Sequence, residues 1–387
     1  MNTNVLRKSL VVGIILLFVG TCIIPATAQH IEKSYQPSSR GNWLYVGGSG
    51  PGNYTKIQDA INNSHDGETV FVYSGLYTER IVIPNAINLI GESKNTTIIS
   101  AEIQDYEILI TLSSSDITIS GFTLRSTGVY YGSLISNSHY YGYLNNITIS
   151  DNIFRGKILW VIYFTICNFC TITKNTFSLN CSIGIYMRNG LNWTITNNTM
   201  NAVGWIGQGM ELEYTSHCIV SNNTFISIRD EGLIIDSQFG TISNNYFFNI
   251  SKAIVMEGSY KNSILSNLID NPTEKMMNSK ELTGILLIGN NNASIVKNII
   301  THCRCGIIVE DSYFSNISMN TFMKNMVHAR FYQKRTSYTI WNQNYWGRPR
   351  VLPKPIFGIE NMYRAFPDVI QFDWHPAKEP YDIPEVI

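Results

Sequence analysis

The chain has 387 residues, of which 14% are charged, and its 28 Lys and Arg balance its 28 Asp and Glu. It carries no basic stripe and none of the common nucleic-acid-binding motifs, so we expect no nucleic-acid partner. Aromatic residues make up 12%, including 22 Tyr, and aromatic faces are common on surfaces that stack on sugar rings.

Residues 1–28 are predicted to be an export signal. Arg7 and Lys8 precede the apolar run Leu10–Ile24, and Ala26-Thr27-Ala28 offers small residues for cleavage before Gln29. An uncleaved anchor is the alternative, although this run is short for a hydrocarbon core of ~30 Å. We therefore expect a secreted, extracellular protein associated with the cell surface, which meets a membrane only through this segment if it stays uncleaved. Residues 29–42 are polar and are expected to form a flexible leader.

The next segment alternates short strands with one helix. Residues 43–46 predict a strand, and residues 54–63 place Ile57, Ala60 and Ile61 on one face of a short amphipathic helix. Further strands are expected at residues 69–73, 75–79, 81–83, 87–91 and 97–99.

From there the chain repeats one phrase, Ile-x-x-Asn followed by a β-forming residue. The intervals between successive Asn residues are 23, 23, 25, 22, 22, 31, 22 and 24. A period of 22–25 residues with strand-like content predicts a solenoid. The nine Asn residues are Asn152, Asn175, Asn198, Asn223, Asn245, Asn267, Asn298, Asn320 and Asn344. Asn at a bend tolerates the left-handed region and can stack its amide along the coil, so we expect these residues to be structural.

A second β-run lies between the Asn phrases and begins after a small residue, as in Gly184-Ile-Tyr-Met-Arg188. Ile, Val, Thr, Phe and Tyr dominate and Asn, Gly and Ser mark the corners, which favours an all-β coil of at least three strands per turn. Alternation then predicts an apolar inward stack. Its members are Ile185, Met187, Met210, Leu212, Leu233, Ile235, Ile254, Met256, Ile285, Leu287, Ile307 and Val309.

Specific phrases resemble a known class of protein. Residues 54–61, Asp66-Gly67, residues 75–79 and residues 87–91 are similar to the opening of pectin-lyase-like right-handed β-helices, in which a helix caps the first coil. The later repeats and Asn344-Tyr-Trp-Gly347 resemble those of carbohydrate-binding and sugar-hydrolase β-helices, including NosD-like proteins. The combination with the signal resembles exported archaeal surface proteins.

The resemblance covers about residues 43–347. It implies a single-stranded right-handed parallel β-helix over 43–347, of about ten or eleven coils, with residues 348–387 as a C-terminal cap. It does not decide the activity, because the fold hosts lyases, hydrolases, epimerases and non-enzymes.

The outward positions of the Gly-led strands form the candidate site. Glu213, Asp236 and Glu257 are expected to stack on successive coils about 5 Å apart, with Glu211 beside them. Like charges at that spacing raise one another's pKa or recruit a cation, so these four acids are candidate ligands for Ca²⁺. The same face and its flanking loops supply the candidate substrate-binding residues Tyr163, Tyr186, Arg188, Trp205, Glu211, Arg229 and Glu310.

Three interpretations of this patch stay open. The first is a solvated acidic face of a structural envelope or adhesion protein. The second is a groove that recognises a polysaccharide or surface glycan, with or without Ca²⁺. The third is a polysaccharide lyase or glycoside hydrolase with Glu213, Asp236 and Glu257 as catalytic residues. The NosD resemblance raises copper, but the seven His are not spaced as metal ligands, and the oligomeric state is not indicated.

The cysteines and the tail complete the expectations. Six Cys follow the signal, and their positions in the repeat favour free buried thiols, although local pairing among Cys167, Cys170 and Cys181 stays open. Asp373 and His375 are either part of a cap or a catalytic or metal pair, and we expect the cap. It would lay Ile356, Phe357, Phe366, Phe372 and Trp374 over the open end of the coil. The eleven Asn-x-Ser/Thr sequons are candidate glycosylation sites.

Overall fold

The computed structural model describes residues 43–128, 131–137, 143–203, 207–272, 282–332, 338–359, 367 and 369–383. The expected signal segment 1–28, the leader 29–42, Trp205 and Phe366 lie outside the described residues. Among the described helices, none is long and apolar enough to cross a bilayer.

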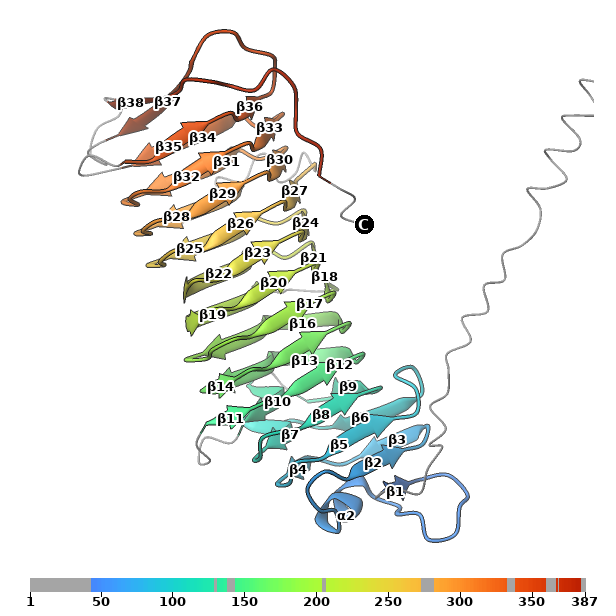
Figure 1. Ribbon diagram of the computed structural model, residues 1–387. Helices are drawn as coiled ribbons and strands as arrows, with labels where there is room; N and C mark the ends of the chain where they lie inside the picture. The colour runs from blue at the N-terminus through green and yellow to red at the C-terminus, as the bar shows by residue number, and fades with distance from the viewer. Residues whose placement is uncertain are drawn as a thin grey trace, which may run out of the picture. The chain divides into compact units, whose positions relative to one another are not determined.

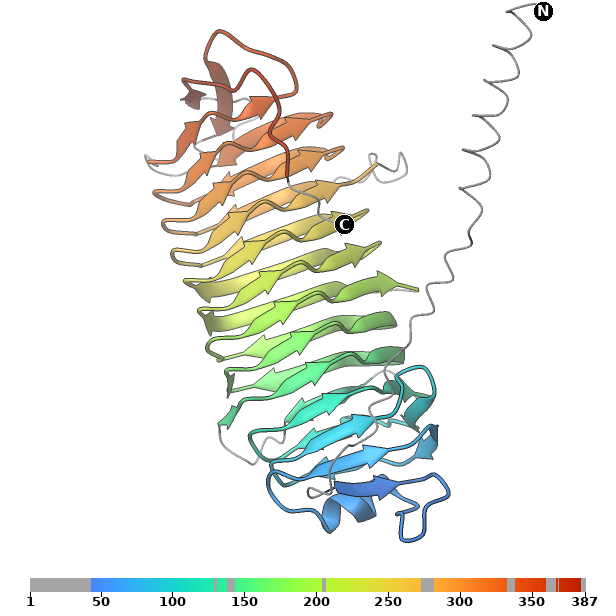
Figure 2. The ribbon, with the colours of Figure 1, turned by 45° about the vertical axis from the view of Figure 1, so that its right-hand side comes forward.

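From residue 43 onward the chain winds as a parallel β-coil, with successive turns stacked on one another (Figures 1 and 2). The expected right-handed β-helix is confirmed. It has about 13 turns, so the expected ten or eleven was too low. The count fell short because the first turns, built from strands such as β2 (Thr69–Val72) and β5 (Asn88–Gly91), lack the Asn phrase yet pair in full register.

Each turn contributes to three parallel sheets. The first sheet contains β1 (Trp43–Val46), β2, β5, β8 (Thr118–Ser120), β12 (Thr148–Ser150), β15 (Thr171–Thr173), β17 (Thr194–Thr196), β20 (Ile219–Ser221), β23 (Thr241–Ser243), β26 (Ser263–Leu265), β29 (Ser294–Val296), β32 (Asn316–Ser318) and β35 (Ile340–Asn342). The second contains β3 (Gly75–Thr78), β6 (Thr97–Ala101), β9 (Thr123–Ser126), β13 (Ile153–Thr165), β16 (Thr176–Arg188), β18 (Thr199–Ala202), β21 (Thr224–Ile226), β24 (Tyr246–Phe248), β27 (Leu268–Asp270), β30 (Ile299–Thr301), β33 (Thr321–Met323) and β36 (Tyr345–Trp346).

The third sheet shares the long strands β13 and β16 with the second. Its other members are β4 (Ile81–Ile83), β7 (Glu107–Leu112), β10 (Gly132–Asn137), β19 (Gln208–Ser216), β22 (Glu231–Gln238), β25 (Lys252–Glu257), β28 (Thr283–Ile288), β31 (Cys305–Glu310), β34 (Val327–Tyr332) and β37 (Lys354–Ile359). A short pair, β11 (Leu144–Asn145) with β14 (Cys167–Asn168), lies at one corner, and β38 (Val369–Asp373) runs antiparallel to β37.

The expected helix is α2 (Ile57–Asn62), and it packs against β1, β2 and β4 at the first turns. Its apolar face of Ile57, Ala60 and Ile61 is buried as predicted. The Glu79 carboxylate accepts hydrogen bonds from the backbone N–H groups of Ile57 and Gln58 at 2.9 and 3.0 Å, so it satisfies donors that a helix start leaves open.

The interior of the coil is the apolar stack expected from alternation, and all twelve predicted inward side chains are buried. The small residue near the start of most third-sheet strands, such as Gly209 in β19 and Gly306 in β31, has a steric reason. A Cβ on Gly209 would lie 2.4 Å from the carbonyl oxygen of Gly232, and a Cβ on Gly306 would lie 2.5 Å from that of His328. Neighbouring turns therefore approach too closely at this corner for most side chains.

The nine repeated Asn residues form a buried ladder, which we call the Asn ladder. In each step the backbone N–H and the side-chain Nδ2 of one Asn donate to Oδ1 of the next, as from Asn198 to Asn223 at 3.0 Å for both. The expected stacking of amides is confirmed. The left-handed residue, however, is the one before the ladder Asn, such as Asn197 with φ 58° and Asn222 with φ 54°. The ladder Asn itself points inward, where it bonds the carbonyls of the preceding turn.

Asp373 ends the Asn ladder. Its buried carboxylate accepts from the backbone N–H of Asn344 at 2.9 Å, from Trp346 Nε1 at 3.0 Å and from the backbone N–H of His375 at 3.2 Å. The geometry therefore matches the capping interpretation, with the carboxylate in the place where the next Asn would stand.

The rest of the tail differs from expectation. Ile356 is buried, but Phe357, Phe372 and Trp374 are exposed rather than laid over the core. The reason is that β37 and β38 close the coil as an antiparallel hairpin, whose alternation turns these rings outward.

The six described cysteines are buried and unpaired, as expected, and the local pairing left open for Cys167, Cys170 and Cys181 does not occur. Burial raises the pKa of the Cys181 thiol to about 12 and that of Cys305 to about 11. These thiols act as small core side chains.

Candidate functional site

The candidate site lies on the outward face of the third sheet, which we call the outer face. Strand register aligns Tyr163, Tyr186 and Glu211 in one column across β13, β16 and β19. A parallel column two residues further on aligns Arg188, Glu213 and Asp236 across β16, β19 and β22. Adjacent strands lie about 4.8 Å apart, so side chains of neighbouring turns can touch.

The aromatic part of the outer face begins at Trp160. The Trp160 and Tyr163 ring centroids lie 4.8 Å apart, and the Tyr163 and Tyr186 rings stack 5.2 Å apart with an interplanar angle of 7°. Trp160 and Tyr163 also line a cavity of about 360 Å³ together with Tyr106, Ser133 and Ser136. The stacked rings therefore continue into a hollow over β7 and β10.

The aromatic and charged parts meet at Glu213. The Tyr186 hydroxyl donates a short hydrogen bond to Glu213 Oε2, and Arg188 Nε lies 3.5 Å from the same oxygen. The Arg188 guanidinium also lies over the Tyr214 ring, 5.6 Å from its centroid. Burial and the bond to Glu213 raise the pKa of Tyr186, so its hydroxyl stays protonated as a donor at neutral pH.

Two neighbouring carboxyl groups are held toward their neutral form. Burial, followed by the charge of Glu213, raises the pKa of Glu211. The same two causes raise the pKa of Asp236, with a further contribution from Glu257. Glu211 and Asp236 are thus half-buried acids beside a carboxylate that is already paired.

The remaining predicted residues are more scattered. Glu257 is exposed at the end of β25, one position beyond the pair Ile235 with Met256, where the register between β22 and β25 ends. Glu310 aligns with Ile288 and Tyr332 at the far end of the outer face, and burial raises its pKa. Arg229 is exposed in the loop before β22. The column that begins with Tyr163, Tyr186 and Glu211 is apolar from there to Arg330. Its members in between are Ile234, Val255, Leu286 and Ile308.

A third outward column was missed because the count of faces began at the small residue of each strand. It holds Trp160, Ile183, Gln208, Glu231 and Lys252 in register. Lys252 Nζ lies 3.0 Å from Glu231 Oε1, and Gln208 Nε2 donates to Glu231 Oε2 at 3.4 Å. Alternation from the inward Ile185, Met210 and Leu233 would have placed this column inward as well, so it is visible only from the strand register and from the half-buried side chains.

The acids align on one face but do not converge as ligands. Across the described residues, no three or more His, Cys, Asp or Glu side chains gather closely enough to hold a metal ion. Glu213 also has its oxygen engaged by Tyr186 and Arg188. The expected Ca²⁺ set of Glu211, Glu213, Asp236 and Glu257 therefore does not fit a cation in this arrangement.

Comparison with known proteins agrees with the coil. A family described as the right-handed beta helix region matches residues 85–240, and one described as periplasmic copper-binding protein (NosD) matches residues 200–351. A search of curated proteins found no match.

Solved structures share the fold at low identity. A mannuronic acid specific polysaccharide family 6 lyase from human gut microbiota is 13% identical over 80% of this chain and 86% of its own, with a TM-score of 0.54. A GH136 lacto-N-biosidase from Eubacterium ramulus is 12% identical over 77% of this chain and 65% of its own, with a TM-score of 0.55. The complex of XylC with xylose is 11% identical over 72% and 75%, with a TM-score of 0.53.

The coil of short parallel strands with an internal Asn ladder defines a right-handed parallel β-helix protein. Its fold is that of the pectin-lyase-like β-helices, as the resemblance of its opening residues predicted.

Proposed function

We propose that the outer face binds a polysaccharide or surface glycan, on a protein exported through the signal segment at residues 1–28. The observation that carries the proposal is the junction at Tyr186, where the stacked rings of Tyr163 and Tyr186 meet the Arg188–Glu213 pair. Tyrosine rings cover the apolar faces of sugar rings, and charged groups beside them bond the hydroxyls.

The layout favours an extended ligand over a small one. Aromatic residues occupy β13 and β16, and the acids follow on β19 and β22 with the Glu231–Lys252 pair beside them. Sugar rings seated along the coil would meet a different set of side chains on each turn. The lyase, the lacto-N-biosidase and the xylose complex share this fold and are named for carbohydrates, which supports a carbohydrate ligand.

Glycan binding is tested with an array of neutral and acidic polysaccharides, once with Ca²⁺ at about 5 mM and once with a chelator. This Ca²⁺ concentration exceeds the Kd of about 0.1–1 mM that is typical of extracellular modules. Tyr186→Ala and Tyr163→Ala should each weaken the strongest interaction about three- to tenfold, because each removes one stacking ring. Tyr260→Ala is the matched control, because Tyr260 lies at the corner that bridges Gln238 and Asn291, away from the outer face. Equal losses in all three variants, or no glycan bound, would leave the structural envelope interpretation.

A glycoside hydrolase is the second candidate, and the raised pKa values of Glu211 and Asp236 favour it. A protonated carboxyl beside an ionised one is the arrangement that glycoside hydrolysis uses, with the pair about 5–5.5 Å apart in retaining enzymes. Asp236 and Glu213 stand on adjacent strands in register. Release of reducing ends that is lost in Asp236→Asn but kept in Glu102→Gln, an exposed control, would establish the enzyme.

A further inference from the structure

The last parallel pair of the third sheet comes apart over half its length. Strand β37 pairs with β34 only through Arg330–Phe357, Phe331–Gly358 and Tyr332–Ile359. One turn earlier, β31 pairs with β34 from Cys305–Val327 onward. As a result Val327 and Ala329 are half-buried, whereas Cys305 and Ile307 beneath them are buried.

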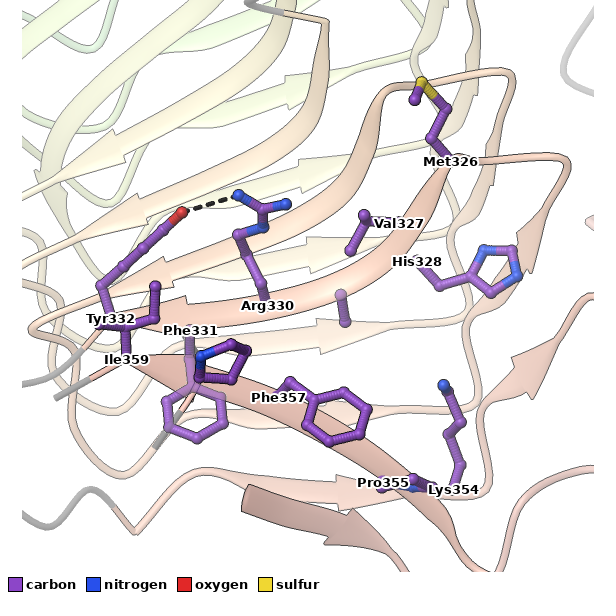
Figure 3. Close-up of a pocket in the computed structure, with 12 residues that line it drawn as sticks. Met326, Val327, His328, Arg330, Phe331, Tyr332, Lys354, Pro355, Phe357 and Ile359 are labelled. Atoms are coloured by element: carbon purple, nitrogen blue, oxygen red, sulfur yellow. Dashed lines mark hydrogen bonds between the residues drawn. The ribbon is translucent and has the colours of Figure 1, made fainter. Parts of the chain in front are cut away.

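The chemistry of the chain explains the separation. Pro355 has no N–H to donate to a parallel neighbour, and Lys354–Gly358 instead pair antiparallel with β38. The first half of β37 is thereby drawn away from β34. A cavity of about 450 Å³ opens between them, lined among others by His328, Arg330, Tyr332, Lys354, Phe357 and Pro355 (Figure 3).

The cavity is basic. Arg330 and Lys354 line it. Burial is the main cause that lowers the pKa of Lys354, and the nearby charges of Arg350 and Arg348 lower it further. The ion pairs among the described residues all lie elsewhere, so none of these four bases has a described carboxylate within 4.0 Å. Arg350 Nε is buried with no hydrogen-bond partner.

The walls of the cavity are suited to a ring. Phe357 is 48% exposed although it lines the cavity, and the half-buried Pro355 and Ile359 add apolar surface. Arg330 Nη1 donates to the Tyr332 hydroxyl at 2.8 Å, which holds the guanidinium in place (Figure 3). Figure 3 also shows the Lys354 amine pointing from β37 toward the side of β34 that carries His328.

We propose that the cavity between β34 and β37 binds a small organic anion, a carboxylate or phosphate carried on a ring of sugar size. Lys354 and Arg330 would face the anionic group, and Phe357 would cover the ring. Among the described residues this positive charge has no carboxylate beside it, and bases left together without a counter-charge repel one another, so an anion would be favoured here. The volume falls within the range of small-molecule sites. This site is separate from the Tyr186 junction that carries the glycan proposal, since β34 lies six strands beyond β16 in the third sheet.

Isothermal titration calorimetry on the full chain at pH 7 tests the proposal with galacturonic acid, glucose 6-phosphate, glucose and inorganic phosphate. We expect at least one anionic sugar to bind, with glucose and inorganic phosphate each at least tenfold weaker. Comparison of the two anionic sugars identifies the anionic group. Equal affinity for glucose would show that the anionic group is not recognised, and equal affinity for inorganic phosphate would show that the ring is not. If no anion binds, the whole proposal is wrong.

Matched variants locate the ligand. Lys354→Gln and Arg330→Gln should each weaken binding tenfold or more, whereas the exposed controls Lys297→Gln and Arg304→Gln should stay within twofold. Lys354→Gln decides the matter if Arg330→Gln proves unstable through loss of the Tyr332 bond, because the Lys354 amine bonds no described side chain that the change would release. Unchanged binding in Lys354→Gln would overturn the site. Tyr186→Ala should leave this binding unaffected, so failure of the glycan proposal is distinguishable.

Discussion

The Asn ladder and the outer face are both columns of polar side chains repeated turn after turn, yet they are opposite in energetics. In the ladder each amide is buried and satisfied on both sides, as Asn223 is by Asn198 and Asn245. On the outer face Glu211, Glu213 and Asp236 are half-buried, and burial and the charge of Glu213 raise the pKa of both Glu211 and Asp236. The ladder therefore stabilises the coil, whereas the outer face holds charge at a cost to stability.

The contrast between the satisfied Asn ladder and the half-buried acids of the outer face indicates which of the two carries function. A satisfied ladder has no bonding capacity left for a ligand, since its last open end is closed by Asp373. Partly buried acids such as Glu211 and Asp236 lower the stability of the folded protein. In our proposal they are retained because they and the neighbouring tyrosines bind a glycan. Variants of the ladder and of the outer face should therefore differ in their effect on the free energy of unfolding.

Breaking the ladder should cost the most. Asn223→Ala removes the acceptor for two donors of Asn198 and the donor to the Ile195 carbonyl, so buried groups are left without partners. We expect a loss of about 3 kcal/mol in the free energy of unfolding, because each unsatisfied buried group costs about 1–3 kcal/mol. Urea denaturation measures it.

The adjacent residue is the matched control. Asn222 is exposed with φ 54°, a conformation that glycine adopts freely, so Asn222→Gly should change stability by less than about 0.5 kcal/mol. Similar losses in both variants would contradict the assignment of the ladder as the stabilising column.

The end of the outer face should be sensitive to acid. Burial, then the charges of Lys354 and Arg350, lower the pKa of His328 to about 4, from an ordinary value of 6.5. The folded state thus resists protonation of His328. The contribution of the neutral imidazole to the free energy of unfolding is therefore complete above pH 6.5, and it is lost as the pH falls from about 6.5 to about 4. After allowance for partial exposure we expect a loss of about 1–2 kcal/mol.

Thermal unfolding between pH 7 and pH 4 checks this dependence. His328→Gln should remove most of that part of the slope, while His65→Gln, at an exposed side chain, should leave it intact. An unchanged slope in His328→Gln would show that another group causes the acid loss.

Glu211 on the outer face should show a pH dependence of stability with the reverse sign. Because the folded-state pKa of Glu211 is raised, its ionisation opposes folding, and stability falls as the pH rises from the ordinary value of 4.5 toward the raised one. Glu211→Gln should therefore stabilise the protein at pH 7 by up to about 1 kcal/mol, and the gain should vanish below about pH 4. Glu102→Gln, at an exposed position, should give no gain. Destabilisation by Glu211→Gln would mean that this carboxylate is structurally required.

The smallest effect on stability is expected at Arg188. Its side chain is 46% exposed, and an exposed ion pair contributes about 0–1 kcal/mol, so Arg188→Gln should cost less than about 0.5 kcal/mol. In calorimetric titrations the same change should weaken glycan binding at the Tyr186 junction. A large loss of stability with unaffected binding would place Arg188 with the ladder rather than with the site.

Much of this arrangement was accessible from the repeat. The interval between Asn residues gave the length of a turn, and alternation from the small residue placed Ile185, Met210 and Leu233 inward. The same count put Tyr186, Glu213 and Asp236 in outward columns that the register confirms. It could not give side-chain contacts, because a column fixes a strand position and not a rotamer.

By itself, then, the sequence determined the coil, its core and its polar columns, because each depends on a period of two along the strand and of 22–25 along the chain. The tertiary structure alone decided that Asp373 completes the Asn ladder and that Tyr186 bonds Glu213. It also decided that β37 turns away from β34 and opens a basic cavity. These features arise where the repeat ends or where neighbouring turns touch, and there no periodic rule applies.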